Sequence, residues 1–418
     1  MNDASPRRDA LRRQLGHWQR ALAALLRFDE IAAPDAWASL EPALVRTIRD
    51  SFSHAASRQM AELASLERRA TGADGGDDAA IEARLVALRQ RYSLLETTVD
   101  FYGDAINSRS NPVMQRTLAG LDRLAGLSMQ RLLAPLGHPV PPVLCYVDRG
   151  LGAAILKAGL RLWDPTVLSP AATIKIARHN LMRPTALIHE TGHQVAHILG
   201  WNEALADALE DALSGESSEL ARVWAGWSSE IAADSYAFVQ TGYAAVANLH
   251  DVLAGGADYV LRYVAGDPHP VSYVRVLLGV EMCNAVFGDG PWQGLARALI
   301  MRYPLVGADP EVAALARASL PMLPRLARLC LDVPLPALGA RGLSHWIDPG
   351  EVAPPVLQRL ALAGGGALSR SPYWSAAEPL RILALSGLQM VTQPARATAI
   401  AETQQQWLQR LETLPAAA

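Results

Sequence analysis

The feature that most restricts the fold is a pair of histidines, His189 and His193, four residues apart in an apolar segment. Residues at i and i+4 lie on one face of an α-helix, so both imidazoles can reach a single Zn²⁺ ion. Glu190 follows the first histidine and can take a proton from a metal-bound water. The alternative is a core helix with two hydrogen-bonded histidines and a surface glutamate. We expect a helix from about Pro184 to Leu199 that ends at Gly200.

A catalytic zinc ion usually has three protein ligands and a water, so a third ligand is expected. His197 continues the spacing, but it would lie about 12 Å along the helix axis from His189. Glu230 is the better candidate, because apolar residues surround it and Asp234 follows one helical turn later. Asp234 would hydrogen-bond an imidazole N–H and fix the orientation of that ring. Four glutamates in a more polar stretch compete with Glu230: Glu203, Glu210, Glu216 and Glu219.

The order His-Glu-x-x-His and then Glu-x-x-x-Asp resembles the gluzincin branch of the zincin metallopeptidases. A third segment, His-Pro-x-x-x-x-Arg at residues 269–275, looks like the corresponding segment of the HtpX-like and CAAX-prenyl-protease metallopeptidases. This chain differs from them in lacking membrane helices. The resemblance covers about residues 143–290. It implies a zincin-like core in which one Zn²⁺ is held by His189, His193 and Glu230, with Glu190 as the general base.

The same resemblance implies roles for other residues near the proposed metal. His269 would stabilise the oxyanion of the tetrahedral intermediate, and Tyr273 or Tyr236 could replace it as the donor. Taken alone, His269 would be a turn histidine in a proline-rich loop. Arg275 would support the site electrostatically, with Asp234 as the expected partner.

Helical patterning dominates the first third of the chain. Apolar residues recur at helical spacing through residues 7–133, with a new helix starting at Pro112. The glycine-rich segment from Thr71 to Asp78 is expected to be a turn or a flexible loop. A proline-rich stretch at 134–142 then indicates a domain boundary.

Short strand-like runs and further helices follow that boundary. The expected strands are Val143–Val147, Ala154–Leu162 and Thr173–Ala177. The clearest later helices are Leu205–Leu213, Leu220–Gln240, Tyr273–Phe287 and 400–413. Zincins bind a peptide by adding it to the sheet edge that precedes the motif helix, and here that edge would be Thr173–Asn180.

These patterns predict a mainly α fold with a small mixed β-sheet (α+β), in which helical regions flank a zincin-like core. Three regions are expected: an N-terminal helical region (1–134), the metallopeptidase core (135–304) and a C-terminal helical region (305–418). The role of the two flanking regions stays open. One hypothesis is that they cover the cleft and keep the enzyme latent.

The composition indicates which kinds of binding partner and which cellular compartment to expect. The chain has 418 residues, 19% of them charged, and a net charge of −3, which favours neither nucleic acid nor an anionic membrane as a partner. No apolar run follows the N-terminal basic residues, and no long apolar stretch is present, so we expect neither a secretory signal nor membrane insertion. Three distant cysteines give no disulfide framework. A cytoplasmic location is expected.

The expected function is a zinc-dependent endopeptidase that acts on a peptide or protein substrate. A protein partner would bind through the helical flanks. Two alternatives remain: a non-catalytic zincin-fold scaffold, and a metal-dependent hydrolase of a non-peptide amide. The sequence leaves the substrate, the cleavage preference and the oligomeric state undetermined.

Overall fold

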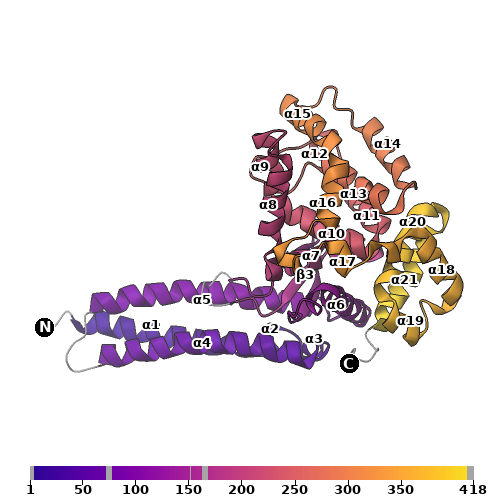
Figure 1. The fold of residues 1–418 in the computed structure, drawn as a ribbon. Helices are drawn as coiled ribbons and strands as arrows, with labels where there is room; N and C mark the ends of the chain where they lie inside the picture. Colours follow the sequence, from indigo (N-terminus) through magenta and orange to yellow (C-terminus); the bar gives the residue numbers. More distant parts are fainter. Residues whose placement is uncertain (1–3, 72–77, 151, 162–167, 412–418) are drawn as a thin grey trace. The chain divides into compact units, whose positions relative to one another are not determined.

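The computed structural model describes residues 4–71, 78–150, 152–161 and 168–411. Helices make up most of it, together with one three-stranded sheet (Figure 1), which confirms the expected fold class. Residues 72–77, which include most of the glycine-rich segment expected to be a loop, lie outside the described residues. The chain divides into two compact units: Met1–Gln115 with Leu156–Thr173, and Arg116–Ile155 with Ile174–Ala418.

The first unit is built mainly from three long helices that pack side by side (Figure 1). They are α1 (Ala4–Ala24), α4 (Pro42–Thr71) and α5 (Asp78–Asn107), with short α2 (Phe28–Ile31) and α3 (Pro34–Ala38) between the first two. Each long helix buries one apolar face, and Leu22, Ile48 and Leu88 are fully buried. The helical pattern expected for this region is therefore confirmed.

The second unit begins within α6 (Pro112–Leu133) and includes part of the sheet. The strands are β1 (Val143–Val147), β2 (Ala154–Leu156) and β3 (Ala172–Ile176), in the order β1-β3-β2. The second strand is shorter than the predicted run to Leu162, a residue outside the described part of the chain.

The expectation that Thr173–Asn180 forms a sheet edge is wrong. Strand β3 lies in the centre and is hydrogen-bonded to β1 on one side and β2 on the other. Residues 178–182 form a 3₁₀ turn, η1 (Arg178–Met182), instead of continuing the strand. Alternating hydropathy indicates which face of a strand is buried. It does not indicate whether the edges of that strand are hydrogen-bonded to neighbouring strands.

The helices that matter for the site are α7 (Thr185–Leu199), α10 (Ser228–Thr241) and α13 (Ser272–Phe287). Helices α7 and α10 approach closely at Gly192, where an added Cβ would lie 2.9 Å from the Ala233 Cα. Because glycine has no side chain, the two backbones can come this near. The contact brings the histidine-bearing face of α7 next to the first turns of α10.

In the sequence, α8 (Trp201–Leu213) and α9 (Ser218–Gly226) lie between α7 and α10, and α11 (Tyr243–Leu253) follows α10. The predicted continuous helix Leu220–Gln240 is wrong, since it breaks at Trp227 between α9 and α10. The indoles of Trp224 and Trp227 are both buried and meet edge to face, 5.4 Å apart. Apolar spacing continues across the break, so the sequence pattern could not reveal it.

The helices after α13 pack against α10, α11 and α13 or against one another, and they do not form a separate unit. The long ones are α14 (Trp292–Arg302), α15 (Pro310–Ser319), α16 (Leu323–Asp332), α18 (Pro354–Gly364), α20 (Pro379–Thr392) and α21 (Ala397–Leu411). Helix α16 contacts α10 and α13, and α20 contacts α10 and α11. The two-unit division therefore differs from the three expected regions, because the C-terminal helices and α6 share a core with the site helices. Among the described helices, none has the length and apolar content needed to cross a membrane.

Candidate metal centre

Helix α7 places both motif histidines on one face, as the spacing predicts. The rings of His189 and His193 lie one turn apart, with centroids 4.7 Å from each other and planes at 85°. The helix ends at Gly200, whose φ of 64° is the left-handed conformation that suits glycine. The predicted helix and its C-terminus are thus confirmed.

Glu230 meets these histidines from α10. Its Oε2 lies 3.4 Å from His189 Nε2, and its Oε1 lies 3.2 Å from His193 Nε2. One ligand atom from each of the three residues lies within 4.8 Å of the others. Zinc ligands stand about 2.0–2.1 Å from the ion in a tetrahedron, so neighbouring donor atoms are about 3.3 Å apart. These three residues could therefore hold one metal ion.

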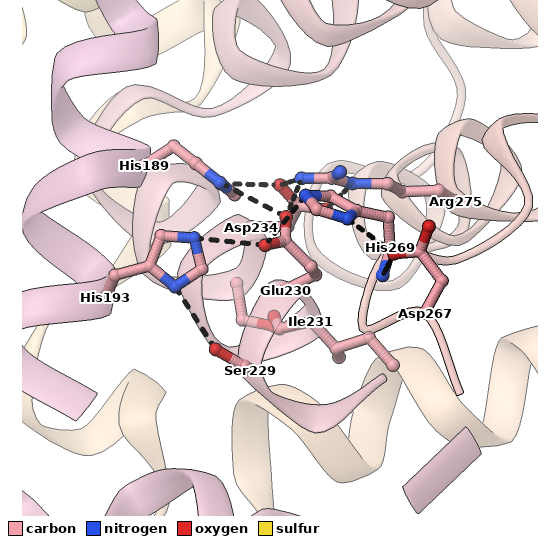
Figure 2. A network of polar contacts seen from close by, with 10 residues as sticks. His189, His193, Ser229, Glu230, Ile231, Asp234, Asp267, His269 and Arg275 are labelled. Carbon is pink, nitrogen blue, oxygen red and sulfur yellow. Dashed lines mark hydrogen bonds and ion pairs between the residues drawn. The ribbon is translucent and has the colours of Figure 1, made fainter. Parts of the chain in front are cut away.

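Figure 2 shows the two imidazoles on one side of the Glu230 carboxylate, with Arg275 and His269 on the other. His197 lies on the exposed surface of α7, outside this group. The competing glutamates of α8, α9 and the turn between them are also outside it.

The second nitrogen of each imidazole has a partner that sets the orientation of the ring. His189 Nδ1 lies 2.8 Å from Asp234 Oδ1, as an ion pair that lacks the alignment of the hydrogen bond expected from the sequence. His193 Nδ1 lies 3.3 Å from the Ser229 hydroxyl. With Nδ1 engaged in both rings, Nε2 is the nitrogen that faces a metal. Sequence analysis missed Ser229, and a serine beside a ligand residue carries no signal of its own.

Arg275 on α13 neutralises the two buried carboxylates. Its Nε and Nη2 donate to Asp234 Oδ2 and Oδ1 at 2.6 and 2.8 Å, and Nη2 also lies 2.9 Å from Glu230 Oε2. Burial is the largest single effect and would raise the pKa of both carboxyls, but Arg275 and the neighbouring histidines together outweigh it and lower both pKa values. The expected pairing of Arg275 with Asp234 is confirmed.

The imidazole of His189 lies between the carboxylates of Asp234 and Glu230. Burial alone would lower its pKa, but the charges of these two carboxylates raise it to about 10. A metal binds only the neutral imidazole, so a metal at this group would compete with a proton for His189.

Glu190 is buried beside the metal group on the same helix. Burial raises its pKa to about 7, against the opposing effect of positive charge on His189, Arg275 and Lys175. A carboxyl with a pKa near neutrality suits proton transfer in both directions.

His269 lies in the loop before α13, and its side chain is 63% exposed. Its Nε2 is 3.6 Å from Glu230 Oε1, so the expected position beside the metal group is confirmed. Asp267 holds this residue twice, through contacts of 2.7 Å to Nδ1 and 3.0 Å to the backbone N–H. Sequence analysis assigned Asp267 no role, although an Asp two residues before a loop histidine is a known turn-forming arrangement.

The two tyrosines considered as oxyanion donors are both buried. The Tyr236 hydroxyl donates to the Ser128 carbonyl at 2.6 Å, and burial raises its pKa to about 12. Tyr236 therefore anchors α10 to α6 and is not available at the metal group. Tyr273 is 2% exposed on α13, and its role as a donor stays a prediction.

The protein is mainly helical and has a His-His-Glu group that could hold a metal ion, with the buried carboxyl of Glu190 beside it. Comparisons with models of protein families, with curated proteins and with solved structures find no match. The resemblance to gluzincins therefore rests on these residues and their arrangement.

Proposed function

We propose that this chain is a zinc-dependent endopeptidase of the gluzincin type. The proposal rests on one observation: His189, His193 and Glu230 converge from two helices at the spacing of a zinc site, with Glu190 beside them. A purely structural zinc site would have no use for this buried carboxyl, which argues against the scaffold alternative.

Zinc bound at this group would polarise the scissile carbonyl and lower the pKa of a water. Glu190 accepts the water's proton on its carboxylate and later delivers it to the leaving amine. In its imidazolium form, His269 would donate from Nδ1 to Asp267 and from Nε2 to the developing oxyanion. Arg275 and Asp234 keep His189 and Glu230 in place.

The sheet offers a peptide substrate the edge of β2. On β1, the backbone N–H of Cys145 already donates to Asp122 Oδ1 at 2.6 Å, so that edge is engaged by α6. Strand β2 is partly exposed, beginning at Ala154. An extended peptide would add there through main-chain hydrogen bonds. The proposal includes a cytoplasmic location, supported by three buried cysteines that form no disulfide with one another.

Metal content and metal removal test the proposal. We expect about one zinc ion per purified chain by inductively coupled plasma mass spectrometry, and slow cleavage of casein. Treatment with 1,10-phenanthroline should abolish cleavage, and added zinc should restore it. Protein that binds zinc but cleaves neither casein nor a random peptide pool would favour the scaffold alternative.

Asp267 provides a second test, because it holds His269 without touching the metal group's ligands. Substitution His269→Ala should lower kcat about 100-fold, as for the loss of one oxyanion donor. Substitution Asp267→Asn should lower kcat about 10-fold, since His269 keeps its ring but loses its orientation. Zinc content should stay the same in both variants.

The matched control is Glu203→Gln, a change at an exposed carboxylate on α8. It should leave kcat within about twofold, because isolated surface changes have small effects. An Asp267→Asn variant with unchanged kcat would remove His269 from the proposed mechanism.

A further inference from the structure

A cavity of about 580 Å³ in the second unit has no role in the proposed function. It lies between three segments: short α12 (Ala257–Val260) with the residues that follow it, the segment that joins α14 to α15, and the first turn of α15 (Figure 1). Sites for small ligands and side chains commonly have volumes of about 300–1,000 Å³. The size of this cavity therefore allows it to take a ligand.

Part of the cavity wall is apolar. Leu261 and Val312 line it and are 9% and 5% exposed, so their side chains pack into the protein at the base of the opening. Tyr263 adds an aromatic ring, and Val306, which is 86% exposed, adds an apolar surface in contact with water. A ligand with an aliphatic portion would remove this surface from water.

The charged residues of the wall are mostly acidic. They are Asp258, Asp309, Glu311 and Arg262. Asp309 caps α15, because its Oδ1 accepts from the backbone N–H groups of Glu311 at 2.9 Å and Val312 at 3.4 Å. Within the described ranges, neither Asp258 nor Glu311 takes part in an ion pair shorter than 4 Å. The exposed carboxylate of Glu311 can therefore still accept a cation.

Two arginines beside the cavity already have other contacts. The guanidinium of Arg302 lies over the ring of Tyr303, 5.3 Å from its centroid. Arg317 Nη2 donates to the Leu305 carbonyl at 3.3 Å. The cation that suits Glu311 would therefore come from another molecule.

The cavity adjoins the residues that surround the metal group. Tyr263 lies in the same loop as Asp267 and His269, between α12 and α13. Its ring meets the indole of Trp227 edge to face, with centroids 6.4 Å apart. The Trp227 carbonyl in turn accepts from the backbone N–H of Glu230 at 3.1 Å. A peptide at the metal group can extend this far, since each extended residue spans about 3.3–3.6 Å.

We propose that this cavity binds an arginine or lysine side chain of the peptide substrate, with the aliphatic stem on Leu261 and Val312 and the charged head at Glu311. The inference rests on the proposed function and names its substrate class. Arginine and lysine join a long apolar stem to a charged head, which matches the two parts of the wall. A charge-assisted hydrogen bond to Glu311 should increase the affinity of such peptides about 10-fold.

Cleavage of a random dodecapeptide pool is the first test. Zinc-loaded wild-type protein is incubated with the pool, and mass spectrometry identifies the products. Arginine and lysine should be enriched at one fixed position relative to the cleaved bond, because the cavity and the metal group belong to the same unit.

Binding of two synthetic peptides isolates the charge. The best-cleaved sequence is labelled with fluorescein and prepared with either arginine or citrulline at that position, since citrulline has nearly the same shape and no charge. Fluorescence anisotropy measures the affinity of each peptide for zinc-loaded Glu190→Gln protein, so that neither is cleaved. The arginine peptide should bind about 10-fold more tightly.

Substitution of Glu311 shows whether this residue carries the preference. Glu311→Gln, combined with Glu190→Gln, should bind both peptides with the affinity of the citrulline peptide. The backbone N–H at position 311 still donates to Asp309, so α15 keeps its cap. The matched control is Glu402→Gln at an exposed position of α21, which should leave both affinities within about twofold. Thermal unfolding verifies that each variant folds, and Glu311→Ala replaces the glutamine variant if that one does not.

The outcomes separate the two proposals. Cleavage without a basic residue at a fixed position, equal affinity for the two peptides, or a preference for arginine that survives Glu311→Gln would each overturn the role of the cavity and leave the peptidase intact. No cleavage of the pool by zinc-loaded protein would overturn the peptidase, and the role of the cavity in substrate binding with it.

Discussion

Replacing Glu190 with glutamine should lower kcat for peptide hydrolysis about 10²- to 10⁴-fold while zinc stays bound. Glutamine has nearly the same shape as glutamate, but it cannot accept the water's proton or return it to the amine. The proposed ligands His189, His193 and Glu230 are unchanged, so metal content should remain about one ion per chain. Stopped assays with a random peptide pool give kcat, and metal analysis of the same samples gives the zinc content.

The matched control for this change is Glu203→Gln on α8, where the side chain is exposed and outside the metal group. It should leave kcat and zinc content unchanged. Glu190→Gln protein that retains zinc and wild-type kcat would show that Glu190 is not the base. If neither protein hydrolyses any peptide but both bind zinc, the site is structural.

Replacing Arg275 with methionine should destabilise the metal-free protein by about 3–5 kcal/mol. The change removes the only guanidinium that contacts both Asp234 and Glu230 among the described residues, and it leaves the two buried carboxylates with His189 as the remaining positive group in contact with both. Urea denaturation followed by circular dichroism measures the free energy of unfolding. A loss of this size is a large fraction of a typical domain's stability.

Zinc should reverse part of that loss. A divalent cation bound to Glu230 supplies the positive charge that Arg275 provided, and any ligand that binds only the folded state stabilises it by mass action. The difference in the free energy of unfolding between Arg275→Met and wild type should therefore shrink when both proteins are saturated with zinc. Arg275→Lys keeps the charge but loses the bidentate hydrogen bond, so its stability should lie between those of wild type and Arg275→Met.

Arg297 on α14 is exposed and serves as the control, with an expected change of less than about 0.5 kcal/mol for Arg297→Met. An Arg275→Met variant as stable as this control would mean that Asp234 and Glu230 are not ionised together in the folded protein. The electrostatic account of the site would then be wrong.

Much of the candidate site could be predicted because its parts are local in sequence. The spacing of His189 and His193 determines that they share a helical face, and the same holds for Glu230 and Asp234 one turn apart. The choice of Glu230 over four other glutamates also came from local context, since apolar neighbours indicate a buried helix. Contacts of 3.2 and 3.4 Å between Glu230 and the two imidazoles agree with that choice.

Other parts depend on contacts between distant segments, and local patterns do not record them. The break at Trp227, the central place of β3 and the burial of the Tyr236 hydroxyl against Ser128 are of this kind. Each depends on what packs beside the residue rather than on the residue's own spacing. Tyr236 had the chemistry of an oxyanion donor, but its partner lies on α6, more than a hundred positions earlier.

The sequence by itself determined which side chains are suited to hold a metal and move a proton, because helical periodicity sets the faces on which they lie. Only the tertiary structure decided which of those faces meet. The close approach of α7 and α10 at Gly192 brings Glu230 to the histidines, and α13 adds Arg275. These are long-range packing contacts between helices, whose free energy depends on the fit of whole surfaces and not on any local pattern.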